Sequence, residues 1–220
     1  MKFRIFVPLA GDSIRADWLE YKDILVVKPN NSSHLCKTYN EAIENAIEDE
    51  IDALILSHDD IRIEDKYIFE KIEKGFEDYD ILGIAGEKGE APEEPTSIRP
   101  TVAWNSGICQ HTHRYHTDYY GSTPSQCVMM DGCFLIININ KIGTCRFDEE
   151  MPANGTEKYD VDFTANATFR HGLKCATWPI WVRHDSEGVG ATSGENWDSH
   201  ELCKEYFIKK WKFPNGKGFK

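Results

Sequence analysis

Apolar residues in the first part of this chain gather in short runs separated by stretches of helical spacing. Runs typical of buried strands lie at residues 3–8, 24–27, 53–57 and 81–85. Between the later runs, apolar residues recur three and four positions apart, within residues 39–48 and 65–78. Short apolar runs that alternate with amphipathic helices predict an α/β fold, with a mostly parallel central sheet and helices on both faces.

The pattern changes after Gly86. Residues 87–126 are rich in Gly, Pro, Thr, Asn, His and Tyr and show no periodicity. Such a long irregular stretch inside a compact domain is usually functional or disordered, and its tryptophan and tyrosines argue against simple disorder. Beyond it, the sequence predicts strands at 133–137 and 175–182 and helices at 159–170 and 197–211. We find no linker, and we expect one domain over residues 1–220.

Composition excludes several classes of protein. The net charge of -12 leaves no basic surface for a nucleic-acid backbone, so we expect no nucleic-acid partner. No apolar run approaches the length of about 18 residues that a membrane span needs. The seven cysteines are scattered and odd in number, which favours free thiols in a reducing compartment over disulfides or a zinc site. We therefore expect a cytoplasmic protein.

Acidic residues and histidines stand at the ends of the predicted strands and at the start of a predicted helix. Four groups share this placement: residues 58–60 (His-Asp-Asp), 131–132 (Asp-Gly), 160–162 (Asp-Val-Asp) and His184. In open α/β sheets, ligands bind outside the carboxyl ends of the strands. Adjacent carboxylates there are costly unless a cation or hydrogen-bond donors satisfy them. The alternative for Asp59 and Asp60 is that they cap the next helix or lie in water.

These motifs, in this order, resemble those of GT-A-fold glycosyltransferases that use nucleotide sugars, of the family-2 type. The matching positions are 39–43, 54–61, 130–135, 147–148, 159–163, 170–172, 184 and 188. The resemblance covers about residues 3–190 and implies a single GT-A (Rossmann-like) domain. Its implied parts are a nucleotide-binding half at 1–86, an acceptor and catalytic half at 87–195, and a C-terminal helix and tail at 196–220.

The resemblance also implies a metal site. Asp60 matches the metal-binding aspartate of the family, and His184 matches a further metal ligand. Carboxylate and imidazole ligands together with diphosphate oxygens suit Mn²⁺ or Mg²⁺. His58 stands where the family has the aspartate that contacts the ribose, so the chain departs from the family here. We expect His58 and Asp59 to contact the nucleotide sugar.

Further site residues follow from the same resemblance. Asp160 matches the catalytic base, although Tyr159 replaces the glutamate that usually precedes it. Asp162 is either a substitute for the base or an N-terminal helix charge. Asp131 and Gly132 match the turn beside the donor sugar and acceptor. Pro8 and Lys28 follow the first two strands, where the family binds the nucleotide.

The expected function is metal-dependent transfer of a sugar from a nucleoside-diphosphate sugar to a hydroxyl of a carbohydrate or other acceptor. The position of Asp160 favours inversion at the anomeric carbon. One alternative is a sugar- or nucleotide-binding module without catalysis. A sugar-phosphate nucleotidyltransferase is less favoured, because residues 10–15 contain one glycine and one arginine where that class has a glycine-rich basic loop. Donor sugar, acceptor and oligomeric state stay open.

Overall fold

The computed structural model describes residues 1–89, 104–111, 116–185 and 197–211. Parts of the expected acceptor half and of the expected C-terminal segment lie outside these residues. The strands are β1 (Phe3–Pro8), β2 (Leu25–Lys28), β3 (Ala53–Ser57), β4 (Ile61–Ile63), β5 (Ile81–Gly83), β6 (Ala85–Lys88), β7 (Ser106–His111), β8 (His116–Gly121), β9 (Ser125–Met130), β10 (Phe134–Asn138), β11 (Cys175–Thr177) and β12 (Val182–His184). The helices are α1 (Leu35–Glu48), α2 (Ile68–Gly75), α3 (Ile139–Ile142), α4 (Tyr159–His171) and α5 (Trp197–Lys210), with short 3-10 helices η1 (Ala16–Tyr21) and η3 (Ala153–Gly155).

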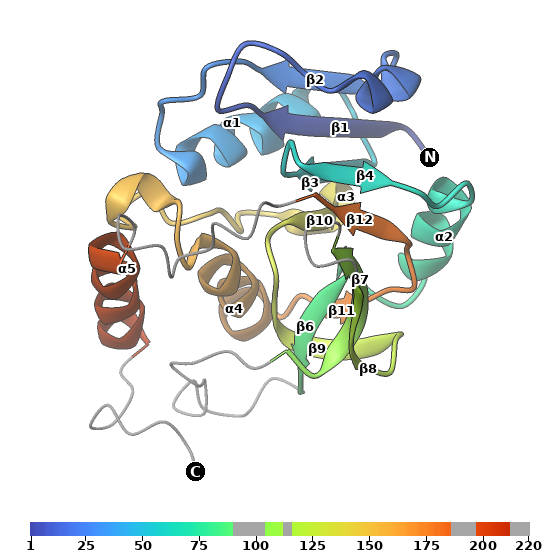
Figure 1. Cartoon of the computed structure of the whole chain (residues 1–220). Helices are drawn as coiled ribbons and strands as arrows, with labels where there is room; N and C mark the ends of the chain where they lie inside the picture. The colour runs from blue at the N-terminus through green and yellow to red at the C-terminus, as the bar shows by residue number, and fades with distance from the viewer. Residues whose placement is uncertain (90–103, 112–115, 186–196, 212–220) are drawn as a thin grey trace.

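The described strands form one mixed sheet (Figure 1). Their order is β2-β1-β3-β10-β5-β11-β9-β6-β7-β12-β4, and β8 pairs with β7. β1 runs parallel to β2 and β3, but β10 inserts antiparallel between β3 and β5. The expectation of a mostly parallel sheet is therefore wrong. An apolar run predicts a buried strand but carries no information about its direction.

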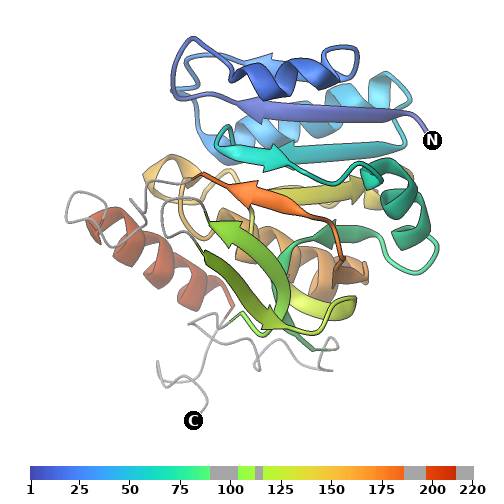
Figure 2. The ribbon, with the colours of Figure 1, turned by 45° about the vertical axis from the view of Figure 1, so that its right-hand side comes forward.

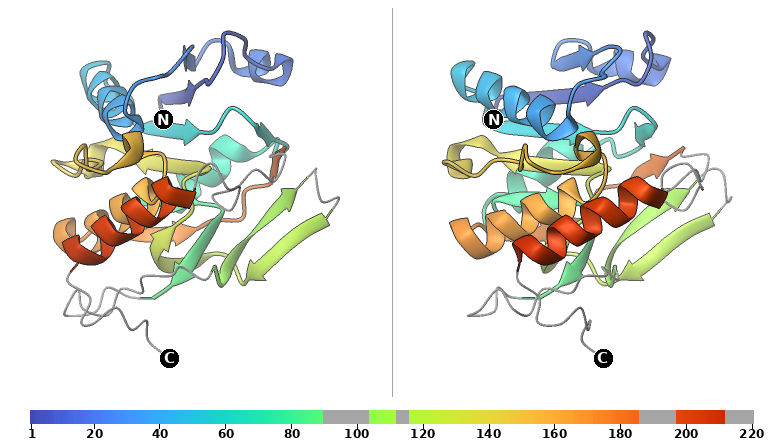
Figure 3. Two further views of the ribbon diagram at one scale, coloured as in Figure 1. Left: turned by 60° about the vertical axis from the view of Figure 1, so that its left-hand side comes forward. Right: turned by 90° about the vertical axis from the view of Figure 1, so that its left-hand side faces the viewer.

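Alternate side chains of the central strands supply two separate hydrophobic cores. Leu54 and Leu56 of β3 join the core under α1 and α4, whereas Ile55 joins the core with α2 and η1. This follows from the two-residue period of a strand, whose side chains point to opposite faces. Figure 3 shows α1, α4 and α5 toward the viewer, with α2 behind the sheet. Helices on both faces are thus present, as expected.

The segment expected to be irregular contains strands. Within residues 87–126, β7 and β8 form an antiparallel hairpin, and β6 pairs with β7 and β9 (Figure 2). The hairpin was not predictable from periodicity, because glycines and polar residues interrupt its alternation. The expected final strand at 175–182 is also two strands, since β11 pairs with β5 and β9 while β12 pairs with β4 and β7.

Helix α4 begins where the sequence predicts and ends at His171, one residue beyond the predicted end. Gly172, just after the helix, has φ 66°, a left-handed conformation that glycine adopts without strain. Among the described residues, no helix combines the length and apolar character that crossing a bilayer requires.

Candidate functional site

Polar side chains follow β3 directly, at the carboxyl end of the strand. All five residues of β3 are buried, and the chain leaves the sheet at residues 58–60. β12 pairs antiparallel with β4, so that His184 lies opposite Ile61. This pairing brings Nε2 of His184 to 3.2 Å from Oδ2 of Asp60. The two expected metal ligands are therefore in contact.

His58 belongs to the same cluster. One possible ligand atom from each of His58, Asp60 and His184 lies within 4.8 Å of the other two. Oδ1 of Asp60 is buried and has no hydrogen-bond partner among the described residues. Such an atom costs free energy unless a cation or donor satisfies it. Two imidazoles and a carboxylate are a common ligand set for transition metals, so these residues fit a divalent cation.

Protons and a cation would compete for this cluster. Burial lowers the pKa of His184, but its hydrogen bond to Asp60 and the charge of Asp60 outweigh burial, so this pKa is raised. Burial raises the pKa of Asp60, yet the hydrogen bond and charge of His184 outweigh it and this pKa is lowered. The pKa of His58 is lowered, mainly by burial. Because a metal binds neutral imidazole, we infer that low pH disfavours metal binding here.

Arginines fix the backbone beside His184. The Asp185 carboxylate accepts a hydrogen bond from Arg15 at 2.5 Å and another from Arg62. The Asp185 N–H donates to the Asp60 carbonyl oxygen at 2.8 Å. These contacts hold the end of β12 against the loop after β3, and so hold His184 beside Asp60.

Asp160 stands in the first turn of α4, beside the turn between β9 and β10. The Gly132 N–H donates to Oδ2 of Asp160 at 2.9 Å, and Oδ1 of Asp131 accepts a hydrogen bond from the Cys133 N–H at 2.9 Å. Burial, and next the charge of Asp131, raise the pKa of Asp160 to about 6. A carboxylate with this pKa is ionised at neutral pH and is a stronger base than an ordinary aspartate.

One cavity joins two members of the cluster of His58, Asp60 and His184 to Asp160. Its volume is about 390 Å³, and its lining residues are His58, Trp104, Asp131, Cys133, Thr156, Glu157, Lys158, Tyr159, Asp160, Val161 and His184. Asp60 is connected to this cavity through its contact with His184. His184, expected to be a metal ligand, and Asp160, expected to be the base, therefore line one space, and Asp60 adjoins it through His184.

A smaller cavity adjoins the first through His58. Its volume is about 190 Å³, and it is lined by Pro8, Leu9, Ala10, Asn31, Leu35, Tyr39, His58 and Asp59. Pro8 and Asp59, both expected to contact the nucleotide, line this second space. Its walls are mostly apolar, with a few polar groups, as in typical small-ligand sites.

Two expected site residues have other partners. Lys28 forms an ion pair with Glu41 at 2.9 Å and does not line either cavity. Asp162 is 1% exposed, and its carboxylate accepts hydrogen bonds from Lys210 at 2.6 Å and from Trp211 at 2.9 Å. The side chain of Asp162 therefore contacts α5, whereas Asp160 faces the cavity.

Tyr159 lies in the candidate site, although the sequence analysis assigned it no role. Its hydroxyl lies 2.7 Å from Nε2 of His58, and it lines the larger site cavity. The signal was present, because Tyr159 and His58 are the two positions at which the chain departs from the family motif. Nothing in the sequence showed that these two residues touch.

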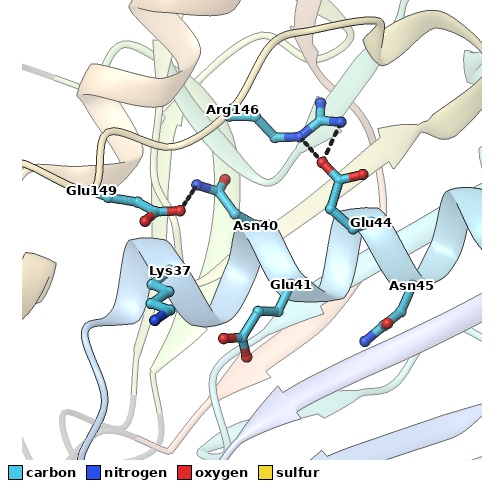
Figure 4. A pocket seen from close by; sticks show the side chains of 7 residues that line it. All are labelled: Lys37, Asn40, Glu41, Glu44, Asn45, Arg146 and Glu149. Atoms are coloured by element: carbon cyan, nitrogen blue, oxygen red, sulfur yellow. Dashed lines mark hydrogen bonds and ion pairs between the residues drawn. The ribbon is translucent and has the colours of Figure 1, made fainter.

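A larger cavity lies elsewhere, on the outer side of α1. Its volume is about 480 Å³, and it is lined by Lys37, Asn40, Glu41, Glu44, Asn45, Arg146 and Glu149 (Figure 4). Each of its carboxylates has a partner: Glu41 pairs with Lys28, Glu44 pairs with Arg146, and Glu149 accepts a hydrogen bond from Asn40. This groove is a polar surface, and its residues are not those of the cluster around Asp60.

Gly132→Ala is expected to damage the site by steric conflict. A Cβ at this position would lie 2.5 Å from the Tyr159 hydroxyl oxygen and 2.6 Å from Cβ of Asp160. Overpacking of this kind costs about 1–3 kcal/mol, which lowers the melting temperature by about 2–12 °C in a chain of this size. Calorimetry measures this loss. Gly11→Ala is the matched control, since no atom lies within 4 Å of its added Cβ. Equal melting temperatures for the two variants would contradict the close packing at Gly132.

Comparisons with known proteins identify the fold. The sequence matches no protein-family model and no curated protein. Among solved structures, A197 from STIV is 18% identical with a TM-score of 0.52, covering 81% of this chain and 82% of that chain. GalNAc-T7, solved with UDP, GalNAc and Mn²⁺, is 11% identical with a TM-score of 0.53, covering 96% of this chain and 49% of that chain. These likenesses show that the chain has a GT-A-like fold.

Proposed function

We propose that this chain is a metal-dependent glycosyltransferase that moves a sugar from a nucleoside-diphosphate sugar to an acceptor hydroxyl. The observation that carries the proposal is the shared cavity of about 390 Å³, which His58 and His184 line together with Asp160. A cation ligand set and a carboxylate base around one space are what such a transfer requires. The fold shared with GalNAc-T7, whose structure holds UDP, GalNAc and Mn²⁺, supports the same proposed function.

The cation site consists of Asp60 and His184, with His58 as a third ligand. A bound divalent cation would stabilise the charge that develops on the leaving nucleoside diphosphate. Mg²⁺ prefers oxygen ligands, whereas imidazole nitrogen suits Mn²⁺. With two histidines in the cluster, the ligand set favours Mn²⁺ over Mg²⁺.

Asp160 acts as the base. Its carboxylate takes the proton from the acceptor hydroxyl as the hydroxyl oxygen attacks the anomeric carbon of the donor sugar. Attack opposite the leaving diphosphate inverts the anomeric centre in one displacement. The hydrogen bond from the Gly132 N–H holds Oδ2 of Asp160, and Asp131 lies beside the donor sugar. We assign no chemical step to Asp162, because its carboxylate already accepts hydrogen bonds from Lys210 and Trp211.

The nucleotide occupies the smaller cavity beside the cation site. Pro8 and Asp59 contribute to its walls, and His58 lies between the two cavities. Lys28 contacts the nucleotide only if it leaves Glu41, its partner at 2.9 Å. The acceptor enters the larger cavity, where Trp104 offers an aromatic face for the apolar side of a sugar ring.

Asp60→Ala is expected to abolish metal-dependent donor binding. With donor and Mn²⁺ at about 100 times their dissociation constants, the wild-type protein gains about 2.7 kcal/mol, or about 5–10 °C in melting temperature. A panel of nucleoside-diphosphate sugars with and without Mn²⁺, read by thermal melting and by release of nucleoside diphosphate, measures both binding and turnover. Without its carboxylate ligand, Asp60→Ala should show no Mn²⁺-dependent gain.

Asp23→Ala is the matched control, because Asp23 is an exposed aspartate between η1 and β2. This variant should keep the full Mn²⁺-dependent gain. Donor binding without any sugar transfer or donor hydrolysis would instead favour a binding module. Absence of binding by the whole panel, with and without Mn²⁺, would contradict the proposed function.

A further inference from the structure

A hydrogen bond connects the metal cluster to the helix that carries Asp160. Nε2 of His58 and the Tyr159 hydroxyl oxygen lie 2.7 Å apart, although 101 residues separate them in the chain. His58 follows β3, and Tyr159 is the first residue of α4. This contact therefore joins the two halves of the shared cavity.

The Tyr159 side chain is packed against two aromatic rings and against Gly132. It is 5% exposed, and its ring centroid lies 5.8 Å from that of Tyr39 and 6.3 Å from that of Phe147. At the hydroxyl end, Gly132 has no side chain, and even a Cβ there would come within 2.5 Å of the Tyr159 oxygen. The hydroxyl is thus confined between Gly132 and His58, and a confined partner can orient an imidazole.

In a metal site, one ring nitrogen of His58 would bind the cation and the other would donate a hydrogen bond. An imidazole that binds a metal through one nitrogen carries a hydrogen on the other, and that N–H needs an acceptor. Nε2 of His58 is taken by Tyr159, so Nδ1 is the nitrogen left for a cation. In the metal-binding tautomer, Nε2–H donates to the Tyr159 oxygen, and the lone pair of Nδ1 is available.

We propose that Tyr159 is a positioning residue for the metal site. Its hydroxyl oxygen accepts the Nε2–H of His58 and so presents Nδ1 of His58 to a cation shared with Asp60 and His184. This inference rests on the metal site of the proposed function. Because Asp160 follows Tyr159 directly, the same hydrogen bond also links the position of the cation to that of the base.

Tyr159→Phe tests this role, because it keeps the ring and removes only the hydroxyl. The measurement is Mn²⁺ affinity without donor or acceptor, from the electron paramagnetic resonance signal of free Mn²⁺. Loss of an orienting partner should weaken Mn²⁺ binding about 10–100-fold. Tyr206→Phe is the matched control, since it removes a hydroxyl that donates to Asp148 at 2.8 Å, outside the cluster. It should bind Mn²⁺ like the wild type.

A double-mutant cycle separates positioning from a general effect on folding. If Tyr159 acts through His58, Tyr159→Phe should change Mn²⁺ affinity less than about twofold in a His58→Ala background. Equal effects of Tyr159→Phe in both backgrounds would overturn the inference. So would wild-type Mn²⁺ affinity in Tyr159→Phe while Asp60→Ala loses binding, and that result would leave the metal site standing. Absence of Mn²⁺ binding by the wild type would overturn both the inference and the metal site.

Discussion

Asp160→Asn is expected to lower the rate of sugar transfer about 10²–10⁴-fold, the usual contribution of a positioned general base. The amide oxygen of asparagine can still accept the hydrogen bond that the Gly132 N–H donates to Oδ2 of Asp160. Geometry is thereby kept, and the lost property is the ability to take a proton. Mn²⁺ and donor binding should stay within about threefold of wild type, because Asp160 is not a member of the cation cluster.

The pH dependence of the wild-type rate follows from the same residue. Asp160 must be ionised to act as base, and burial, followed by the charge of Asp131, raises its pKa to about 6. The rate should therefore be level above this pH and fall tenfold for each unit below it. A bound divalent cation in the same cavity favours the ionised form, so the midpoint of the loaded enzyme lies at or below about 6. In Asp160→Asn this limb of the profile should disappear when Mn²⁺ and donor are kept saturating at each pH, because the separate effect of low pH on metal binding is then removed.

Asp131→Asn provides the control that assigns the base. The charge of Asp131 is the second cause of the raised pKa of Asp160, so its removal should move the midpoint to lower pH while transfer continues. If Asp131→Asn instead abolished transfer and Asp160→Asn worked at the wild-type rate, the roles of the two aspartates would be reversed. Single-turnover rates between pH 4.5 and pH 8, with initial donor binding measured separately, distinguish these outcomes.

Local sequence predicted the strands of this fold better than their arrangement. The apolar run at 53–57 corresponds to β3 in the structure, because burial on both faces requires apolar side chains at every position. Strand direction depends on contacts that are distant in sequence. Phe134 of β10 lies opposite Ser57 of β3 in an antiparallel pair, and no periodicity within residues 133–137 encodes that pairing. The mixed sheet could therefore not be derived from the patterns alone.

For the candidate site too, the sequence indicated several of the residues but not their contacts. The resemblance to the glycosyltransferase motifs implied that Asp60 and His184, which both stand after predicted strands, are metal ligands. In the structure, β12 brings them to 3.2 Å by pairing with β4. His58 and Tyr159 looked like two unrelated departures from the family motif, and only the three-dimensional structure shows their contact. Asp162 sits in the same first turn as Asp160, yet the 3.6-residue period of a helix turns the two side chains in different directions. Adjacent motif positions therefore do not share one role.

Lys210→Met is expected to destabilise the protein by about 3–5 kcal/mol, the usual cost of stranding a buried charge. Nζ of Lys210 lies 2.6 Å from Oδ2 of Asp162 and 2.6 Å from Oδ2 of Asp148. The Asp162 side chain is 1% exposed, so water cannot replace the lost ammonium. In a chain of this size, the loss corresponds to about 6–20 °C in melting temperature. Chemical denaturation and calorimetry measure it.

The neighbouring Lys209 supplies the matched control, because it is exposed on the same turn of α5. Lys209→Met should change the free energy of unfolding by less than about 0.5 kcal/mol. The double variant Asp162→Leu with Lys210→Met should recover part of the lost stability, since it removes the uncompensated carboxylate together with its partner. If Lys210→Met were as stable as Lys209→Met, the Lys210 contacts would not hold α5 against α4. Recovery of stability in the double variant, with donor binding intact, would show that Asp162 attaches α5 and is not needed for donor binding. Asp160 would then remain the carboxylate of this turn that faces the cavity.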